Sequence, residues 1–199
     1  INNGGNGAPL TPIFHELLKN KYNIDNAIFI NLGGISNLSF ISNNNIIAFD
    51  CGPCCSISDE FIKKKLNLDF DYNGKLALNG KSKYKIINKL IKHNYFMLKP
   101  PKTLDRLDIP IDEIYKLSVN DGLATINSFI VKTIEVGTYN FIKKTDTIIL
   151  LGGGRKNTDL INKLKKRIKK KILIAEELGI NGDLVEASAF AYLAIRSLK

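Results

Sequence analysis

Two glycine-rich segments are the parts of this sequence whose residue types best suit ligand binding. Asn31-Leu-Gly-Gly-Ile-Ser-Asn37 lies between two apolar runs, and Leu150-Leu-Gly-Gly-Gly-Arg-Lys-Asn157 ends a third. Glycine has no Cβ, so backbone N–H groups can approach a phosphate, and a glycine turn that opens a helix adds the positive helix end. Neither segment has the Lys-Ser/Thr ending of a P-loop or the spacing of a dinucleotide fingerprint. The first is also compatible with a plain hairpin turn.

A carboxylate near the end of the chain is the third candidate. Glu186 stands among small and apolar residues in Asp183-Leu-Val-Glu-Ala-Ser-Ala-Phe-Ala191. A partly buried carboxylate needs a partner or a ligand hydroxyl. The alternative is an exposed helical glutamate, which is the commoner location of this residue type.

The three cysteines, Cys51, Cys54 and Cys55, lie within five positions. They have no distant partners, which excludes a disulfide framework of the secreted type. The Cys51-x-x-Cys54 spacing suits a metal or a redox pair, but no second pair or suitable histidine is nearby. Their role stays open at this stage.

Apolar patterns predict the strands and helices that hold these residues. Three short runs rich in Ile and Phe, separated by turn formers, predict an antiparallel meander over 27–32, 38–42 and 46–50. Helical spacing predicts helices over 13–18, 57–66, 86–91 and 160–168, a long helix with Asp121 as its N-cap, and a last helix from about Asp183. Strands are expected at 147–151 and 172–174. This order predicts a mixed five-stranded sheet with helices on both faces, an α/β fold.

Composition excludes several classes of protein. With 199 residues and 44% hydrophobic content, the chain suits a single soluble domain. The net charge of +10 arises because basic residues outnumber acidic ones, and the basic residues are 25 lysines and only 4 arginines. Proteins that bind nucleic acids usually contact base edges and phosphates with the forked guanidinium of arginine. We therefore do not predict a nucleic-acid partner. No run approaches the roughly 18 apolar residues of a membrane helix, and no signal peptide opens the chain, which favours a cytoplasmic location without a membrane partner.

The order of the motifs is similar to a known architecture. The glycine hairpin, the glycine strand end and the small-residue helix resemble the phosphate-2, adenosine and connect-2 elements in the second domain of the actin-like ATPase and sugar-kinase superfamily. The likeness narrows with a longer series that spans the chain: Gly4-Gly-Asn-Gly-Ala-Pro-Leu10, Phe14-His15, Asn31 to Asn37, Phe49-Asp-Cys-Gly-Pro53, Pro100-Pro-Lys102, Asp121-Gly-Leu-Ala-Thr125, Gly152-Gly-Gly154 with Asn157, and Glu186-Ala-Ser-Ala-Phe-Ala191. This series resembles the anhydro-N-acetylmuramic acid kinase family.

The resemblance implies a ribonuclease H-like, actin-type ATPase domain covering 1–199. Its core would be about 27–66 and 119–199, with a helical insertion at about 67–118, and the family's N-terminal domain would be absent. The family uses ATP and Mg²⁺ to convert 1,6-anhydro-N-acetylmuramic acid into N-acetylmuramic acid 6-phosphate in peptidoglycan recycling. Its catalytic aspartate would precede Ile1, so this chain alone is expected to be inactive and to hold no catalytic residue. The alternative is a degenerate, non-catalytic nucleotide-binding remnant.

The resemblance also assigns roles to residues. Expected nucleotide contacts are Gly33, Gly34, Asn37, Gly152, Gly153, Gly154 and Asn157, and expected sugar contacts are Gly5, Asn6, His15 and Glu186. Asp50 would hold Mg²⁺ through water, or else cap the following turn. His15 could instead be structural, and Lys102 is expected to be solvated rather than to meet a phosphate.

The resemblance also implies partners, and the sequence differs from the family at one motif. The anhydro-sugar is the expected substrate, and both a separately encoded N-terminal half and a homodimer are compatible with the resemblance. Relatives carry Thr-Gly-Pro-Gly-Asn where this sequence has Cys51-Gly-Pro-Cys54-Cys55.

Overall fold

A single mixed β-sheet organises the molecule. The computed structural model describes residues 10–43, 45–105 and 108–198. The strands are β1 (Ala27–Leu32), β2 (Ile35–Ser42), β3 (Asn45–Pro53), β4 (Thr147–Leu151) and β5 (Lys171–Ile174), in the spatial order β3-β2-β1-β4-β5. β1, β2 and β3 form an antiparallel meander, whereas β4 runs parallel to β1 and β5 runs parallel to β4. This strand order is that of the ribonuclease H-like fold predicted from the sequence, and the mixed five-stranded sheet is confirmed.

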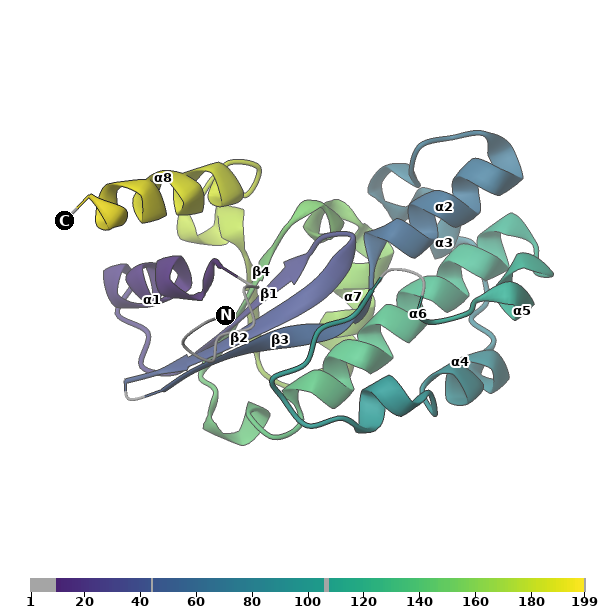
Figure 1. Ribbon diagram of the computed structural model, residues 1–199. Coiled ribbons are helices and arrows are strands. Elements are labelled where there is room, and N and C mark those ends of the chain that lie inside the picture. The colour runs from purple at the N-terminus through teal and green to yellow at the C-terminus, as the bar shows by residue number, and fades with distance from the viewer. Residues whose placement is uncertain (1–9, 44, 106–107, 199) are drawn as a thin grey trace.

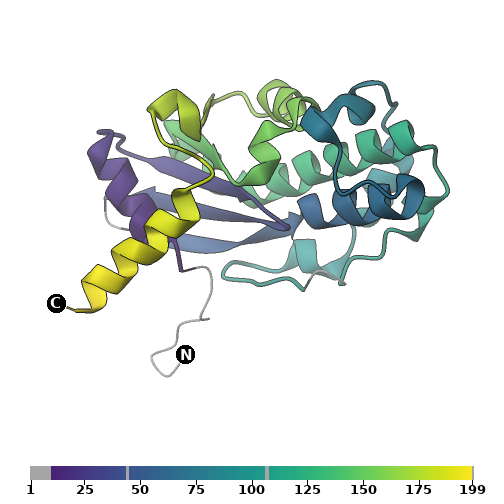
Figure 2. The same ribbon diagram turned by 90° about the horizontal axis from the view of Figure 1, so that it is seen from above.

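Helices cover both faces of the sheet, as predicted. One face carries α2 (Cys55–Leu66), α6 (Val119–Thr138) and α7 (Thr158–Arg167), with the short helices α3 (Lys75–Leu78), α4 (Tyr84–Leu90) and α5 (Asp112–Tyr115) beyond them. The other face carries α1 (Pro12–Lys21) and α8 (Val185–Ser197). Figure 1 shows the long α6 on one side of the sheet and α1 and α8 on the other. In Figure 2, α1 and α8 lie side by side, and the rings of Phe14 and Tyr192 join them with centroids 5.9 Å apart.

Strand alternation explains why two cores form. Successive side chains of a strand point to opposite faces, so a strand buried on both faces must be apolar throughout. In β1, Ile28 and Ile30 belong to the larger core under α6, and Phe29 belongs to the smaller core under α1 and α8. All three are fully buried. The apolar run in this segment is therefore a central strand with covered faces.

Two strand boundaries extend further than predicted. β2 begins at Ile35 and β3 continues to Pro53. Because Leu32 pairs with Ser36, the turn between β1 and β2 consists of Gly33, Gly34 and Ile35. Pairing of Ile35 with Pro53 and of Ser36 with Gly52 explains this extension. A side-chain hydrogen bond adds to it, because Ser36 Oγ donates to the Gly52 carbonyl at 3.0 Å. Glycine and proline are unfavourable inside a strand, but the ladder tolerates both at its end.

The prediction that Asp121 caps the long helix is wrong. The N-cap is Ser118, whose Oγ accepts the N–H of Asp121 at 3.3 Å. The Asp121 carboxylate instead accepts the N–H of Lys81 at 2.8 Å and pairs with Lys83 at 2.6 Å. Ser118 lies three residues before the orphan amide and therefore meets the capping distance, which leaves Asp121 to hold the preceding segment.

The expected insertion at 67–118 packs against α6. A Cβ at Gly80 would lie 1.9 Å from the Asn120 carbonyl oxygen, so this segment approaches the start of α6 very closely. Its apolar side chains join the larger core: Ala77, Ile87, Tyr95, Phe96, Leu104, Ile109, Ile111 and Ile114. Of the helices in the described residues, none has both the length and the apolar character that crossing a membrane requires.

Candidate ligand site at the glycine-rich end of the sheet

Strand register brings the two glycine-rich bends together. Asn31 pairs with Leu151 in the parallel β1–β4 ladder, so both strands end at the same edge of the sheet. Gly33 and Gly34 follow β1, while Gly152 to Gly154 follow β4. A Cβ at Gly154 would lie only 2.8 Å from the Cβ of Leu32. The two bends are therefore in contact, although almost 120 residues separate them along the chain.

The three glycines after β4 have different structural roles. Gly152 has φ +78°, and a Cβ there would lie 2.3 Å from Asn31 Oδ1 and 2.8 Å from the carbonyl carbon of Leu32. Any other residue would be strained in this conformation and would also collide. Around Gly153, by contrast, an added Cβ would meet nothing within 4 Å. Gly152 and Gly154 are thus needed for packing, and Gly153 presents open backbone.

The start of α2 supports the Gly33-Gly34 hairpin. The N–H groups of Cys54 and Cys55 donate to the carbonyls of Gly34 and Gly33, each at 2.9 Å. Ser56 Oγ donates to the Gly34 carbonyl at 2.7 Å. Helix N-terminal amides have no partner within the helix, so these bonds satisfy them and fix the hairpin.

A cavity of about 340 Å³ opens beside these bends. Its lining comes from the ends of β1 and β4, the start of β2, the turn after β4, and the α1 and α8 segments. The residues are Leu10, Thr11, His15, Asn31, Asn37, Leu151, Gly152, Gly153, Arg155, Gly182, Asp183, Val185, Glu186 and Phe190. Five predicted site residues are among them, namely Asn37, Gly152, Gly153, His15 and Glu186. The structure therefore brings predicted nucleotide and sugar residues to one cavity.

Five other predicted residues do not line the cavity. Gly33, Gly34 and Gly154 belong to the bends, Asp50 lies in β3, and the side chain of Asn157 contacts Asn127 of α6. Gly5 and Asn6, expected on the sugar side, fall outside the described residues.

His15 lines the cavity from α1 and is 1% exposed. Its ring stacks on Phe29 with centroids 4.7 Å apart, and Nδ1 lies 3.1 Å from Ser39 Oγ. Burial lowers the pKa of His15 to about 3. The imidazole is neutral near pH 7, because an apolar environment disfavours its charged form.

Glu186 is exposed on the first turn of α8 and borders the cavity. The helix places it one turn before Phe190, which lines the same cavity. The carboxylate is thus open to a ligand rather than partly buried within the protein.

Asn157 and Asp50 both bond to the protein's own backbone. Asn157 is the N-cap of α7, and its Oδ1 accepts the N–H of Leu160 at 3.1 Å. The Asp50 carboxylate accepts the N–H of Leu104 at 3.0 Å, and burial raises its pKa. Asp50 is the register partner of Asn37, so its side chain lies on the same face of the sheet as that cavity residue.

Two residues that line the cavity, Arg155 and Asn31, belong to the glycine-rich segments but were not among the expected ligand contacts. Arg155, next to the glycines, is 5% exposed and donates to the Gly152 carbonyl at 2.9 Å and to the carboxylates of Glu176 and Asp183. Asn31 is the penultimate residue of β1 and lines the cavity. Odd positions of β1 share this face, so strand alternation was the signal for Asn31. For Arg155 no local signal indicated this role, because its two carboxylate partners, Glu176 and Asp183, are more than 20 positions away.

Lys102 is buried rather than solvated, as are two of the three cysteines. Lys102, expected in solvent, is 9% exposed and donates from Nζ to the Tyr95 carbonyl at 3.0 Å. Cys51 and Cys54 are buried and Cys55 is partly exposed, all three as free thiols. Burial raises the pKa of Cys51 to about 12, so its thiol is protonated near neutral pH. In the described part of the chain, no group of three or more His, Cys, Asp or Glu side chains could hold a metal ion.

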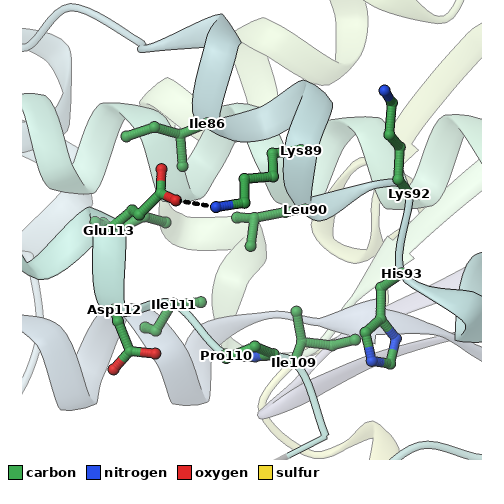
Figure 3. A pocket seen from close by; sticks show the side chains of 11 residues that line it. Ile86, Lys89, Leu90, Lys92, His93, Ile109, Pro110, Ile111, Asp112 and Glu113 are labelled. Carbon is green, nitrogen blue, oxygen red and sulfur yellow. Dashed lines mark hydrogen bonds and ion pairs between the residues drawn. The ribbon is translucent and has the colours of Figure 1, made fainter.

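A second cavity, of about 380 Å³, lies within the 67–118 segment, away from the glycines. Figure 3 shows its apolar residues, including Ile86, Leu90 and Ile109, with Lys89 and Glu113 paired to each other at one side. None of the predicted site residues lines it. The predicted site residues gather at the glycine-rich end instead, which makes that end the better candidate site.

The sequence matches the family model described as "Anhydro-N-acetylmuramic acid kinase" over residues 1–199. This chain belongs to the anhydro-N-acetylmuramic acid kinase family. Among curated members, the kinase of Zymomonas mobilis is 36% identical over 97% of this chain and 53% of its own length. The Pelagibacter ubique kinase is 37% identical over 99% of this chain and 56% of its own length. This family member therefore spans about half the length of the curated relatives it matches.

Solved structures give a more distant likeness. The Clostridium difficile activator of 2-hydroxyisocaproyl-CoA dehydratase, with bound ADPNP, has a TM-score of 0.47 and 14% identity, covering 83% of this family member and 57% of that chain. The Acidaminococcus fermentans (R)-2-hydroxyglutaryl-CoA dehydratase component A has a TM-score of 0.49 and 13% identity, covering 83% and 60%.

Proposed function

We propose that this chain is the portion of an anhydro-N-acetylmuramic acid kinase that contacts ATP and sugar. The proposal rests on one cavity that is lined by Gly152 and Gly153, by Asn31 and Asn37 on either side of the first glycine bend, and by Glu186. The curated relatives are kinases of this name and about twice as long, so turnover is assigned to the whole protein and requires the other half. The pathway is cell-wall recycling in the cytoplasm.

The glycines provide the nucleotide contacts. Gly153 has open space where a side chain would stand, and Gly152 and Gly154 allow the turn to pack against β1. The hairpin at Gly33 and Gly34 would face the phosphates, because phosphate is the ligand expected where backbone amides are accessible at a glycine turn. Asn37, on the cavity wall beside this hairpin, would add a side-chain amide.

The sugar would meet the α1–α8 side of the cavity. The Glu186 carboxylate can accept hydrogen bonds from sugar hydroxyls, whereas neutral His15 can offer a ring nitrogen without introducing a charge. In the overall reaction, water adds at the anomeric carbon, the bond from that carbon to O6 breaks, and O6 takes the γ-phosphoryl group while ADP leaves. The water proton goes to an aspartate base, which lies outside this chain by the family resemblance.

The residues at this end of the sheet suit a magnesium ion held mainly by the nucleotide. Mg²⁺ keeps several waters and uses one or two carboxylates together with substrate phosphates. Asp50 is the carboxylate on the sheet face of Asn37, and it would act through water because Leu104 already occupies one of its oxygens. When bound, the ion neutralises phosphate charge, and phosphoryl transfer depends mostly on such neutralisation and on positioning.

A phosphorylation assay tests the proposal. The polypeptide would be incubated with ATP, Mg²⁺ and 1,6-anhydro-N-acetylmuramic acid, first alone and then with the remaining half of the Zymomonas mobilis kinase. We expect no product alone and N-acetylmuramic acid 6-phosphate from the mixture. The control replaces Glu186 with Gln in the same mixture, which should lower turnover at least tenfold.

Nucleotide binding separates the outcomes. Isothermal titration with ATP and with GTP should show binding that prefers the adenine nucleotide. Binding without turnover in the mixture would favour the non-catalytic remnant. No binding of either nucleotide would exclude the proposed function altogether.

A further inference from the structure

Arg155 joins the glycine turn to the segment that precedes α8. Its guanidinium donates from Nη1 to the Gly152 carbonyl at 2.9 Å, from Nη2 to Glu176 Oε1 at 2.7 Å and from Nη2 to Asp183 Oδ1 at 2.9 Å. Nε adds bonds to both oxygens of Glu176, at 2.9 and 3.2 Å. A buried arginine with this many acceptors is held in a single geometry, since the planar fork fixes all its donors at once.

The segment before α8 is built around this side chain. A Cβ at Gly182 would lie 2.2 Å from Arg155 Nε, so the backbone there passes directly against the guanidinium. The Gly182 N–H also donates to Glu176 Oε1 at 3.3 Å. Glu186 follows four residues later and lines the cavity from the first turn of α8. The position of Glu186 therefore depends on contacts that Arg155 organises.

The same side chain sets the direction of a peptide group at the cavity. In a trans peptide the C=O and N–H groups point in opposite directions, so fixing the Gly152 carbonyl also fixes the Gly153 N–H. Gly152 and Gly153 both line the cavity, and glycine backbone would otherwise rotate readily. Because Lys156 neutralises Asp183 from outside at 2.8 Å, the cluster has no excess charge to compensate.

We infer that Arg155 is a positioning residue that couples the nucleotide-side glycine turn to the sugar-side helix α8. This inference rests on the proposed function, since it deepens the account of the same site. The coupling has a simple direction: a ligand that orders Gly153 also orders Glu176, Asp183 and the start of α8. Arg155 itself need not contact the ligand.

Arg155→Lys tests the coupling because it keeps the charge but loses the fork. One ammonium cannot reach the Gly152 carbonyl and both carboxylates together. We expect affinity for ATP, ADP and AMP to fall by the same factor, about tenfold, because the turn lies on the side shared by all three nucleotides. A general loss of structure would also lower all three affinities alike, so protection of β2 in the exchange experiment below separates it from a loss of positioning. Gly34→Ala, at the phosphate side, is the matched contrast and should weaken ATP more than AMP.

Lys156→Met is the control for charge. It removes one positive charge from the next residue, but Lys156 bonds only to the exposed Asp183 carboxylate and leaves Gly152 untouched. Nucleotide affinity should stay within about twofold of the unmodified chain.

Hydrogen–deuterium exchange gives a readout that does not need a ligand. In Arg155→Lys, amides of 150–154 and of 175–186 should both exchange faster, whereas β2 should keep its protection. Faster exchange in only one of the two segments would overturn the coupling. Unchanged nucleotide affinity in Arg155→Lys, with binding by the unmodified chain, would overturn the inference but not the proposed function. Absence of nucleotide binding by the unmodified chain would instead overturn the function.

Discussion

At the scale of single residues, neighbouring glycines make a sharp pair of predictions. Gly152→Ala forces a positive φ on alanine and a collision with Asn31, so the free energy of unfolding should fall by about 1–3 kcal/mol. Gly153→Ala meets open space and should change stability by less than about 1 kcal/mol, yet it should weaken ATP binding. Chemical denaturation and titration calorimetry on both variants measure these changes. Equal stability loss in the two variants would contradict the assignment of separate roles.

The buried histidine predicts a pH dependence of stability. The unfolded chain binds a proton at His15 near pH 6.5, whereas the folded chain does so only at about pH 3. Stability from this group is therefore complete above about pH 6.5 and declines as pH falls toward 3, with a slope of up to about 1.4 kcal/mol per pH unit.

His15→Gln should reduce this slope, because glutamine does not titrate. Urea unfolding at several pH values between 3 and 7 measures the difference between the two chains. Identical slopes would show that His15 takes up its proton in the folded state.

At the scale of elements, Asn157 shows how a residue predicted to bind ligand also serves the fold. Its Oδ1 caps α7 and also lies 3.3 Å from Asn127 Nδ2. Asn157→Ala should lower the free energy of unfolding by about 1–2 kcal/mol. Asn157→Asp keeps both acceptor contacts and adds a negative charge at a helix N-terminus, so stability should be maintained. If the side-chain N–H₂ group binds nucleotide, Asn157→Asp alone loses affinity at unchanged stability, as thermal unfolding with and without ATP would reveal.

At the scale of the whole molecule, α8 has an uncovered apolar side. It buries only Val185 and Ala189, while Phe190 is 51%, Ile195 61% and Leu198 87% exposed. Exposed apolar surface of this kind favours association. We therefore expect the chain to self-associate with rising concentration, and Ile195→Lys to reduce this. Sedimentation velocity measures this self-association. Tyr84→Lys, on the distant α4, is the control and should associate like the unmodified chain. Equal association of all three chains would contradict the expectation.

Much of the architecture could be predicted from local patterns. The alternation of Ile28, Phe29 and Ile30 in a continuous apolar run indicated a strand buried on both faces, and the helical spacing from Ile57 to Leu66 located α2. Boundaries were less predictable. Ser118 rather than Asp121 caps α6, because the competing contacts of Asp121 with Lys81 and Lys83 come from another segment.

The candidate site divides in the same way. Local sequence patterns were sufficient to predict the two glycine-rich bends, the glutamate on the last helix and the family, since backbone freedom and residue order are local properties. Three further features came from the folded structure: the turn after β4 packs against Leu32, His15 is buried and neutral, and Arg155 joins the glycine turn to α8. Those facts depend on the parallel pairing of β1 with β4 and on packing between distant segments, and no local pattern encodes them.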